Sequence, residues 1–198
     1  MFTGIVEDTG KVVSFTERSE SWKLVLEVGT TITDMGIGDS LACNGCCLTV
    51  TEIDGNRLAF DLLDETVRLT SFQQIQPGSL INLERSLPAN GRLGGHFVTG
   101  HIDCAGEIST FEQRGKNHYL RINPPKEFHK YLVYKGSVAI DGISLTVAEA
   151  DDDGLAVWLI PHTLEVTNLH QRKAGEVVNL EFDLLAKYVE KIGYGDRA

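Results

Sequence analysis

The stretch that decides the fold is residues 38–50, GDSLACNGCCLTV, because the chain repeats it 97 positions later as residues 135–147, KGSVAIDGISLTV. Two further blocks return at nearly the same spacing, TGIVE at 3–7 as TGHID at 99–103, and PGSLINLE at 77–84 as AGEVVNLE at 174–181. Solenoid repeats run to roughly 20–50 residues, so this period instead matches the length of a small domain. We expect two copies of one fold, each with a similar binding site.

Most of the chain shows the pattern of short strands. Alternation of apolar and polar residues with a period of two is typical of half-buried strands, and it occurs in both halves, for example at Leu24 and Leu26 and again at Leu120 and Ile122. Turn-forming pairs such as Pro77-Gly78 separate these segments. Many short strands with regular turns favour antiparallel barrels or sandwiches, so we expect an all-β chain.

Two segments show a helical pattern. Residues 125–132 begin with a proline suited to a first helical turn, and residues 183–192 carry an apolar stripe. The second segment has no counterpart in the first copy, and it either covers one end of a barrel or pairs with the same helix of other subunits. We favour pairing, because so short a helix needs packing to be stable. Residues 87–95, with a proline and several glycines, are the expected linker between the copies.

Composition narrows the class of protein. A net charge of −10 and the lack of basic runs argue against binding to a nucleic-acid backbone. Neither a signal peptide nor a membrane span is visible, so we expect a cytoplasmic protein whose cysteines are reduced thiols. Cys43 and Cys46 together with His101 and Cys104 offer the ligands of a zinc site, but neither pair has a match in the other copy. We therefore expect no metal.

The repeated stretch carries two small polar side chains in each copy. Cys47 and Thr49 correspond to Ser144 and Thr146, and alternation along a strand places each pair on one face. A glycine just before each pair allows close backbone approach, which suits a flat ligand with a polar edge. Alternatively, these side chains face the core and bond neighbouring backbone. Their presence in both copies favours the binding site.

Two substitutions give the second copy ionisable groups that the first lacks. His101 takes the place of Ile5, and Lys135 takes the place of Gly38. His101 lies in a segment that otherwise follows the N-terminus, so we treat it as a functional candidate. The remaining histidines are expected at the surface or in packing: His96, His118, His129, His162 and His170. A third paired region, residues 61–66 and 158–163, ends a strand and enters a turn, where barrels expose backbone to ligands.

These motifs together give the chain a family resemblance. It closely resembles riboflavin synthase of the alpha-chain type over essentially its whole length, through MFTGIVE at 1–7, NGCCLTV at 44–50, GGH at 94–96, GH at 100–101, YKG at 134–136 and DGISLTV at 141–147. The resemblance implies two tandem homologous antiparallel Greek-key barrels and a short C-terminal α-helix that joins three chains into a homotrimer. It divides the chain into N-terminal and C-terminal lumazine-binding barrels at 1–96 and 97–184, and an oligomerisation helix and tail at 185–198.

The resemblance also implies a reaction. Family members convert two molecules of 6,7-dimethyl-8-ribityllumazine into riboflavin and 5-amino-6-ribitylamino-pyrimidinedione by four-carbon transfer, the last step of riboflavin biosynthesis, with no cofactor or metal. The productive site forms between the N-terminal barrel of one subunit and the C-terminal barrel of its neighbour. Some members dock within a lumazine synthase shell, and the sequence does not decide this point. The alternative is a non-catalytic relative that binds a lumazine or flavin as a fluorescent antenna; retention of both pockets favours the enzyme.

Carried onto this sequence, the family's pockets take the following residues. The first would use Gly4, Ile5, Val6, Cys47, Leu48, Thr49, Asp61, Leu62, Leu63, Asp64, Glu65 and Thr66. The second would use Gly100, His101, Ile102, Lys135, Ser144, Leu145, Thr146, Trp158, Leu159, Ile160, Pro161, His162 and Thr163. Positions implicated in the family's active site are also matched by Phe2, Thr3, Ser40 and Asp183. Candidates for relaying protons are His101, Ser144, Thr146 and Thr49, and Cys47 is a candidate for a polar contact or a nucleophile.

Overall fold

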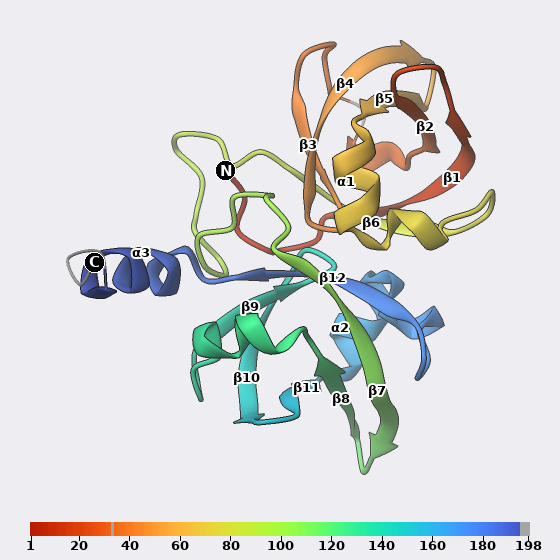
Figure 1. Ribbon diagram of the computed structural model, residues 1–198. Coiled ribbons are helices and arrows are strands. Elements are labelled where there is room, and N and C mark those ends of the chain that lie inside the picture. Colours follow the sequence, from red (N-terminus) through yellow and green to blue (C-terminus); the bar gives the residue numbers. More distant parts are fainter. Residues whose placement is uncertain (33, 195–198) are drawn as a thin grey trace.

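Each copy of the repeat folds into a closed antiparallel barrel of six strands, and Figure 1 shows one barrel above the other. The computed structural model describes residues 1–32 and 34–194. The strands of the first barrel are β1 (Asp8–Glu17), β2 (Trp22–Glu27), β3 (Ser40–Cys43), β4 (Cys46–Asp54), β5 (Arg57–Leu62) and β6 (Leu80–Arg85). Those of the second are β7 (Cys104–Arg114), β8 (Asn117–Asn123), β9 (Ser137–Ile140), β10 (Ile143–Asp151), β11 (Gly154–Leu159) and β12 (Val177–Phe182).

The strand order confirms the Greek-key barrels. Around the first barrel the order is β1-β2-β5-β4-β3-β6, and the second barrel has the same order in its own strands. Hairpins join β3, β4 and β5, and β6 returns to lie beside β3, which is the Greek-key arrangement. Closure pairs the strand edges within each barrel, so the binding surfaces are formed by strand ends and outward-facing side chains.

The predicted strand faces are also confirmed. Leu24, Leu26 and Phe60 are fully buried in the first barrel, and Leu120 and Ile122 are fully buried in the second. Burying one such side chain stabilises the fold by about 1.5–3 kcal/mol, and each barrel has a separate apolar core of this kind. The two domains therefore have their own cores, as their length predicted.

The barrels meet at the tips of two equivalent hairpins. The turn between β3 and β4 is Asn44-Gly45, with φ of 45° and 79°, and the turn between β9 and β10 is Asp141-Gly142, with φ of 45° and 80°. Positive φ at both central positions is typical of two-residue hairpin turns with this composition. A Cβ at Gly45 would lie 2.7 Å from the backbone nitrogen of Gly142, and the reverse distance is the same. Glycine at both tips is therefore required for this contact.

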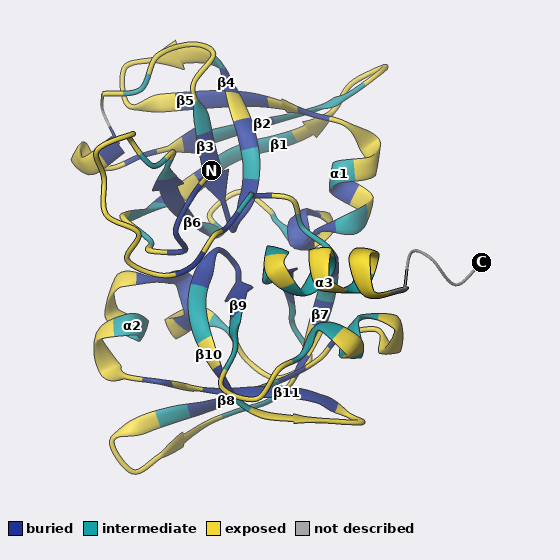
Figure 2. Ribbon diagram, turned by 90° about the vertical axis from the view of Figure 1, so that its left-hand side faces the viewer, coloured by how far each residue is buried: buried dark blue, intermediate teal, exposed yellow. Residues whose placement is uncertain are grey.

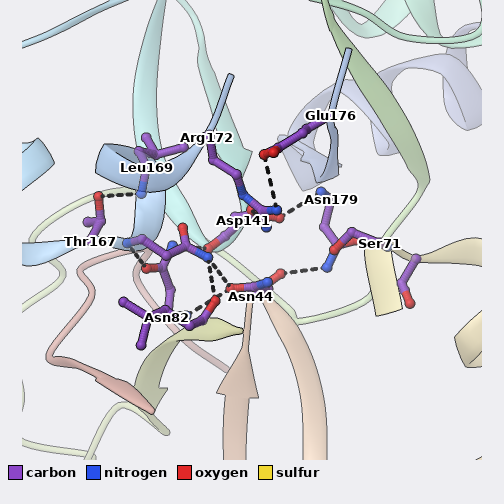
Figure 3. A network of polar contacts seen from close by, with 12 residues as sticks. Asn44, Ser71, Asn82, Asp141, Thr167, Leu169, Arg172, Glu176 and Asn179 are labelled. Atoms are coloured by element: carbon purple, nitrogen blue, oxygen red, sulfur yellow. Dashed lines mark hydrogen bonds and ion pairs between the residues drawn. The ribbon is translucent and has the colours of Figure 1, made fainter. Parts of the chain in front are cut away.

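A reciprocal network of asparagines orients the barrels around this contact (Figure 3). Asn82 Nδ2 donates to the carbonyl of Asp141, and Asn179 Nδ2 donates to the carbonyl of Asn44, each over 2.9 Å. Both asparagines are 1% exposed. Because each bond crosses from one barrel to the other in a buried setting, the network fixes how the two copies face each other.

Two short helices follow the strand ends that were expected to enter simple turns, and this corrects the sequence interpretation. α1 (Asp64–Leu69) follows β5, and α2 (Pro161–Val166) follows β11. Each has six residues, too few to show a helical period in the sequence. Short 3₁₀ helices lie at η1 (Thr30–Ile32), η2 (Ser71–Gln74), η3 (Lys126–Tyr131) and η4 (Asn168–Gln171). The predicted helix at 125–132 is thus one of these 3₁₀ helices.

The predicted C-terminal helix is α3 (Leu184–Tyr194), and most of its apolar stripe is exposed. Glu190 on the inner side bonds Lys130 and Tyr131 of the second barrel. The outer side carries Leu185, Tyr188, Val189 and Ile192, which are 58–78% exposed. Figures 1 and 2 show the helix beside the second barrel with much of its surface exposed. The stripe therefore does not cover a barrel end; the last four residues of the predicted tail lie outside the described residues.

Candidate functional site

Each barrel is preceded by a lead segment, residues 1–7 or 97–103, and the two lead segments pair with each other. Phe2 and Val98 exchange backbone hydrogen bonds of 2.7 and 3.2 Å. Both side chains are buried in a small apolar cluster between the barrels, together with Ala42. Phe2, predicted as an active-site residue, thus holds the lead segments in place.

Beyond this pairing, each lead segment reaches the opposite barrel. The N–H of Cys47 donates to the carbonyl of Gly100 over 2.8 Å, and the N–H of Ser144 donates to the carbonyl of Gly4 over the same distance. A Cβ at Gly100 would lie 2.5 Å from Cβ of Cys47, and a Cβ at Gly4 would lie 2.6 Å from Cβ of Ser144. Glycine is therefore needed at both crossing points.

This exchange corrects the expected grouping of residues into pockets. Residues 4–6 were grouped with Cys47 and residues 100–102 with Ser144, but the structure places them the other way round. Ile102 packs against the core of the first barrel, and Val6 packs against the core of the second. The repeat aligns the two lead segments with each other without indicating which barrel each one contacts, so the sequence could not reveal the exchange.

A hollow of about 230 Å³ lies beside Cys47. It is lined by Cys47, Glu65 and Thr66 of the first copy and by His101 and Ile102 of the lead segment that crosses over. Three predicted ligand-binding regions, the strand β4, the start of α1 and residues 100–102, therefore meet at one place. A thiol, a hydroxyl, a carboxylate and an imidazole around an apolar wall suit a flat ligand with polar edges.

The small polar side chains of the repeat face away from the barrel cores. Cys47 and Ser144 are half-buried, and Thr49 and Thr146 are exposed. The alternative that they face the core is therefore wrong. Several predicted leucines do face a core and can offer a ligand only their backbone: Leu48, Leu62 and Leu159 are buried, and Leu145 packs against the second core.

The strand ends of both copies expose side chains at equivalent places. Leu63 and Ile160, which align in the repeat, are both exposed apolar residues. The other predicted residues of these strand ends are exposed or half-buried. The exposed ones are Asp61, Asp64, Glu65, Trp158, Pro161 and His162, and the half-buried ones are Thr66 and Thr163. Asp64 accepts a hydrogen bond of 3.0 Å from the indole N–H of Trp22. Matched apolar side chains left exposed in both copies are what two similar ligand sites require.

His96 is a residue that sequence reasoning missed. Its Nδ1 lies 2.7 Å from Oγ of Ser144, and the ring is buried. Burial lowers the pKa of His96, and the carboxylate of Asp183 acts in the opposite direction. The signal was present in the sequence as the GGH motif at 94–96. Asp183 also lines a hollow of about 710 Å³ between α3 and the second barrel.

Thr3 and Ser40, two further predicted active-site residues, make contacts within the fold. Buried Thr3 donates through its N–H and Oγ1 to Glu84 at 2.7 and 2.8 Å. Burial raises the pKa of Glu84, although these hydrogen bonds act against the shift. Ser40 is half-buried and pairs with Thr49 across β3 and β4.

Lys135 is exposed and has a φ of 64°, whereas the aligned Gly38 has a φ of 93°. Left-handed backbone costs a non-glycine residue roughly 1–2 kcal/mol. A lysine kept in such a conformation points to a role for its charge, because backbone strain of this kind concentrates at functional sites.

The three cysteines considered as zinc ligands, Cys43, Cys46 and Cys104, are buried strand residues. Cys43 and Cys46 are cross-strand neighbours on either side of the Asn44-Gly45 turn. Burial raises the pKa of Cys46 to about 12 and that of Cys104 to about 12, so both side chains are neutral thiols near a pH of about 7. Within residues 1–32 and 34–194, no group of three or more histidine, cysteine or acidic side chains is placed to hold a metal. In the same ranges, no helix is long and apolar enough to span a bilayer.

Comparison with known sequences agrees with this geometry. A model of the lumazine binding domain matches the chain twice, at residues 3–86 and 99–183. Riboflavin synthase of Actinobacillus pleuropneumoniae is 42% identical over 191 residues, which cover 96% of this chain and 89% of that protein. Riboflavin synthase of Escherichia coli is 42% identical over 185 residues, which cover 92% of this chain and 87% of that protein. Riboflavin synthase of Bacillus subtilis is 40% identical over 189 residues, which cover 96% of this chain and 88% of that protein.

Solved structures share the fold. LumP complexed with 6,7-dimethyl-8-(1'-D-ribityl) lumazine superposes with a TM-score of 0.84 at 24% identity, over 92% of this chain and 99% of that one. LumP complexed with riboflavin gives a TM-score of 0.85 at 26% identity over the same shares of the two chains. With two lumazine binding domains and about 40% identity to riboflavin synthases over nearly its whole length, the chain belongs to the riboflavin synthase family.

Proposed function

We propose that this chain converts two molecules of 6,7-dimethyl-8-ribityllumazine into riboflavin and 5-amino-6-ribitylamino-pyrimidinedione. The observation that carries the proposal is the duplicated site. Each copy presents an outward-facing small polar side chain, Cys47 or Ser144, against a lead-segment glycine, and each lies within a match to the lumazine binding domain. Two equivalent sites suit a reaction whose two substrates are identical molecules.

The proposed chemistry depends on holding two lumazine rings together. A proton leaves the C7 methyl group of one ring, a nucleophile adds at C7 of the other, and a four-carbon unit is transferred through two eliminations. Positioning the rings face to face turns an encounter of two molecules into a reaction within one complex. In this proposal the proton relays are His101, Ser144, Thr146 and Thr49, and Cys47 provides a polar contact or a nucleophile. The residues present supply this acid–base chemistry without a cofactor.

The direct test is incubation of the purified protein with 6,7-dimethyl-8-ribityllumazine while riboflavin absorbance is followed. Riboflavin and the pyrimidinedione should form in equal amounts. A complex that keeps the lumazine spectrum indefinitely would instead indicate the antenna, which the likeness to LumP makes the second candidate. Variants with Cys47→Ala or Ser144→Ala should lose turnover more than they lose folding, because both side chains lie outside the barrel cores.

We further propose that α3 joins three chains, so that the first barrel of one subunit faces the second barrel of its neighbour. The outward apolar stripe of α3 supports this, since contiguous exposed apolar surface marks an interaction site. The hollow beneath α3 extends that surface, because Val133 and Ala186 line it. The four free thiols fit a reducing cytoplasm.

Replacing Val189 by glutamate tests this assembly. A charge at the centre of the apolar stripe should give monomers of 21.8 kDa by light scattering, where the parent protein has three times that mass. The monomer should still bind lumazine and lose riboflavin formation, because the paired site is shared between subunits. Lys191→Glu is the matched control, since it changes the charge on an exposed residue of the same helix outside the stripe. A Val189→Glu protein that stays trimeric would contradict the proposal.

A further inference from the structure

The linker between the barrels brings one buried histidine that the repeat does not account for. His96 is 8% exposed, although its neighbours Gly95 and Phe97 are exposed. Its Nδ1 lies 2.7 Å from Oγ of Ser144, and its backbone N–H donates to the carbonyl of Thr3 over 3.1 Å. A Cβ at Gly95 would lie 2.7 Å from Cβ of Ser144, so glycine is what lets the linker approach this closely.

The surroundings of His96 give it the properties of a proton acceptor. Burial lowers the pKa of the ring, and Asp183 is the charged group that acts against this shift. The N-terminal segment that contacts His96 through Thr3 carries Glu7, and Thr3 itself bonds the carboxylate of Glu84, while β10 presents the hydroxyl of Ser144. The ring is therefore neutral near a pH of about 7 and can accept a proton at Nδ1. An imidazolium formed here would be opposed by burial and supported by Asp183, so proton uptake is reversible.

The first copy has no equivalent of this pair. Cys47, the counterpart of Ser144, shares its hollow with His101. His101 is exposed, and across the described ranges no hydrogen bond joins its side chain to Cys47. The hydroxyl–imidazole pair is thus a feature of the second site alone.

We propose that His96 takes up, through the hydroxyl of Ser144, the proton that leaves the C7 methyl group of the lumazine on the second barrel. The inference rests on the proposed function. Oγ of Ser144 bonds the methyl hydrogen while its own proton passes to Nδ1 of His96. The electron pair of the broken C–H bond is delocalised into the pteridine ring, and the imidazolium later returns the proton by the same route. His96 acts through Ser144 and is therefore a positioning residue that also stores the proton.

The test follows exchange of the C7 methyl protons with deuterium oxide by proton NMR, corrected for exchange of free lumazine. His96→Ala and His96→Asn should lower protein-catalysed exchange and kcat by about 100-fold, the scale of general base catalysis, with KM little changed. Asparagine keeps an acceptor near the position of Nδ1 and lacks its basicity, so it separates hydrogen bonding from proton uptake. Added imidazole should partly restore exchange in His96→Ala. Protonation of His96 should lower kcat at acid pH in the parent protein, and this fall should be absent from both variants.

The control and the double variant keep the result decisive. His118→Asn changes a half-buried histidine that, like His96, has one buried ring nitrogen without a hydrogen-bond partner in the described structure, Nδ1 in His118 and Nε2 in His96. It should exchange like the parent. Ser144→Ala combined with His96→Asn should be no slower than Ser144→Ala alone, because the two residues act in one path. Parent-like exchange in His96→Asn would overturn the relay. A parent protein that binds lumazine and forms no riboflavin would instead overturn the proposed function.

Discussion

The two hairpin tips at the junction of the barrels occupy equivalent places with different chemistry. Asn44 Oδ1 accepts 2.8 Å from the N–H of Asn82, and Asp141 Oδ1 accepts 2.8 Å from the N–H of Asn179. The second oxygen of Asp141 is bound by Arg172 at 2.8 Å, where the first copy has the partly buried Ile75. Both copies keep a side-chain oxygen that accepts a hydrogen bond from the backbone, at Asn44 or Asp141. The second copy alone has a carboxylate at this position, and it also has the arginine that pairs with it.

Arg172→Ile is the change expected to break this comparison most severely. It leaves the fully buried carboxylate of Asp141 without its cation, which should cost about 3–5 kcal/mol in unfolding free energy. The double variant Asp141→Asn, Arg172→Ile recreates the chemistry of the first copy and should recover most of that loss. Urea unfolding measures both. Equal losses in the single and double variants would show that the ion pair is not the reason for the effect.

The pH dependence of Arg172→Ile has a defined sign. Burial raises the pKa of Asp141, and Arg172 acts against that shift, so removing Arg172 raises the pKa further. An acid with a raised pKa in the folded state contributes stability below its unfolded pKa of about 3.9, and that stability is lost as pH rises through the folded pKa. The deficit of Arg172→Ile should therefore shrink as pH falls toward the unfolded pKa. A deficit that stays constant with pH would contradict a role for the carboxylate.

Gly100→Ala and Gly4→Ala test the exchange of the lead segments. Both glycines have positive φ, 83° and 78°, and an added methyl group would overlap Cys47 in one case and Ser144 in the other. Strain of about 1–3 kcal/mol is expected in each variant. In calorimetric titration with lumazine, the affinity of one of the two sites should fall by at least about tenfold, equivalent to about 1.4 kcal/mol. The first-barrel site should be weakened in Gly100→Ala and the second-barrel site in Gly4→Ala.

Gly115→Ala is the matched control for backbone strain, because Gly115 has a φ of 66° and open space around it. It should keep both lumazine sites. To decide which site is lost, each alanine variant is combined with Cys47→Ala, which removes a side chain of the first site. If Gly4→Ala weakened the site of Cys47 and spared that of Ser144, the lead segments would serve their own barrels.

The repeat carried most of what could be predicted about the fold. Because Leu24, Leu26 and their counterparts alternate strictly, their burial and the barrel class could be read directly from the chain. The crossing of Gly4 and Gly100 could not, since which barrel a segment contacts depends on a junction made of residues far apart in sequence. His96 was missed because the GGH motif does not indicate which side chain the histidine contacts, and its contact with Ser144 exists only after both barrels have folded.

Lys135→Gly makes the second copy resemble the first at a position where both copies have a positive φ. Relief of left-handed strain, about 1–2 kcal/mol, is offset by the roughly 0.5–1 kcal/mol that glycine loses through its greater unfolded-state freedom. Stability should therefore change by less than about 1 kcal/mol in urea unfolding. Affinity of the second-barrel site should fall several-fold, since the exposed ammonium group has no carboxylate partner in the described ranges and contacts only the exposed ring of Tyr134 there, 5.1 Å from its centroid. Gly38→Lys is the reverse change, and it should lower stability because Gly38 has a φ of 93°. It should not raise the affinity of the first site, because the added charge is not expected to contact a ligand there. Unchanged lumazine binding in Lys135→Gly would mean that the second copy keeps its strained lysine for a reason other than the ligand.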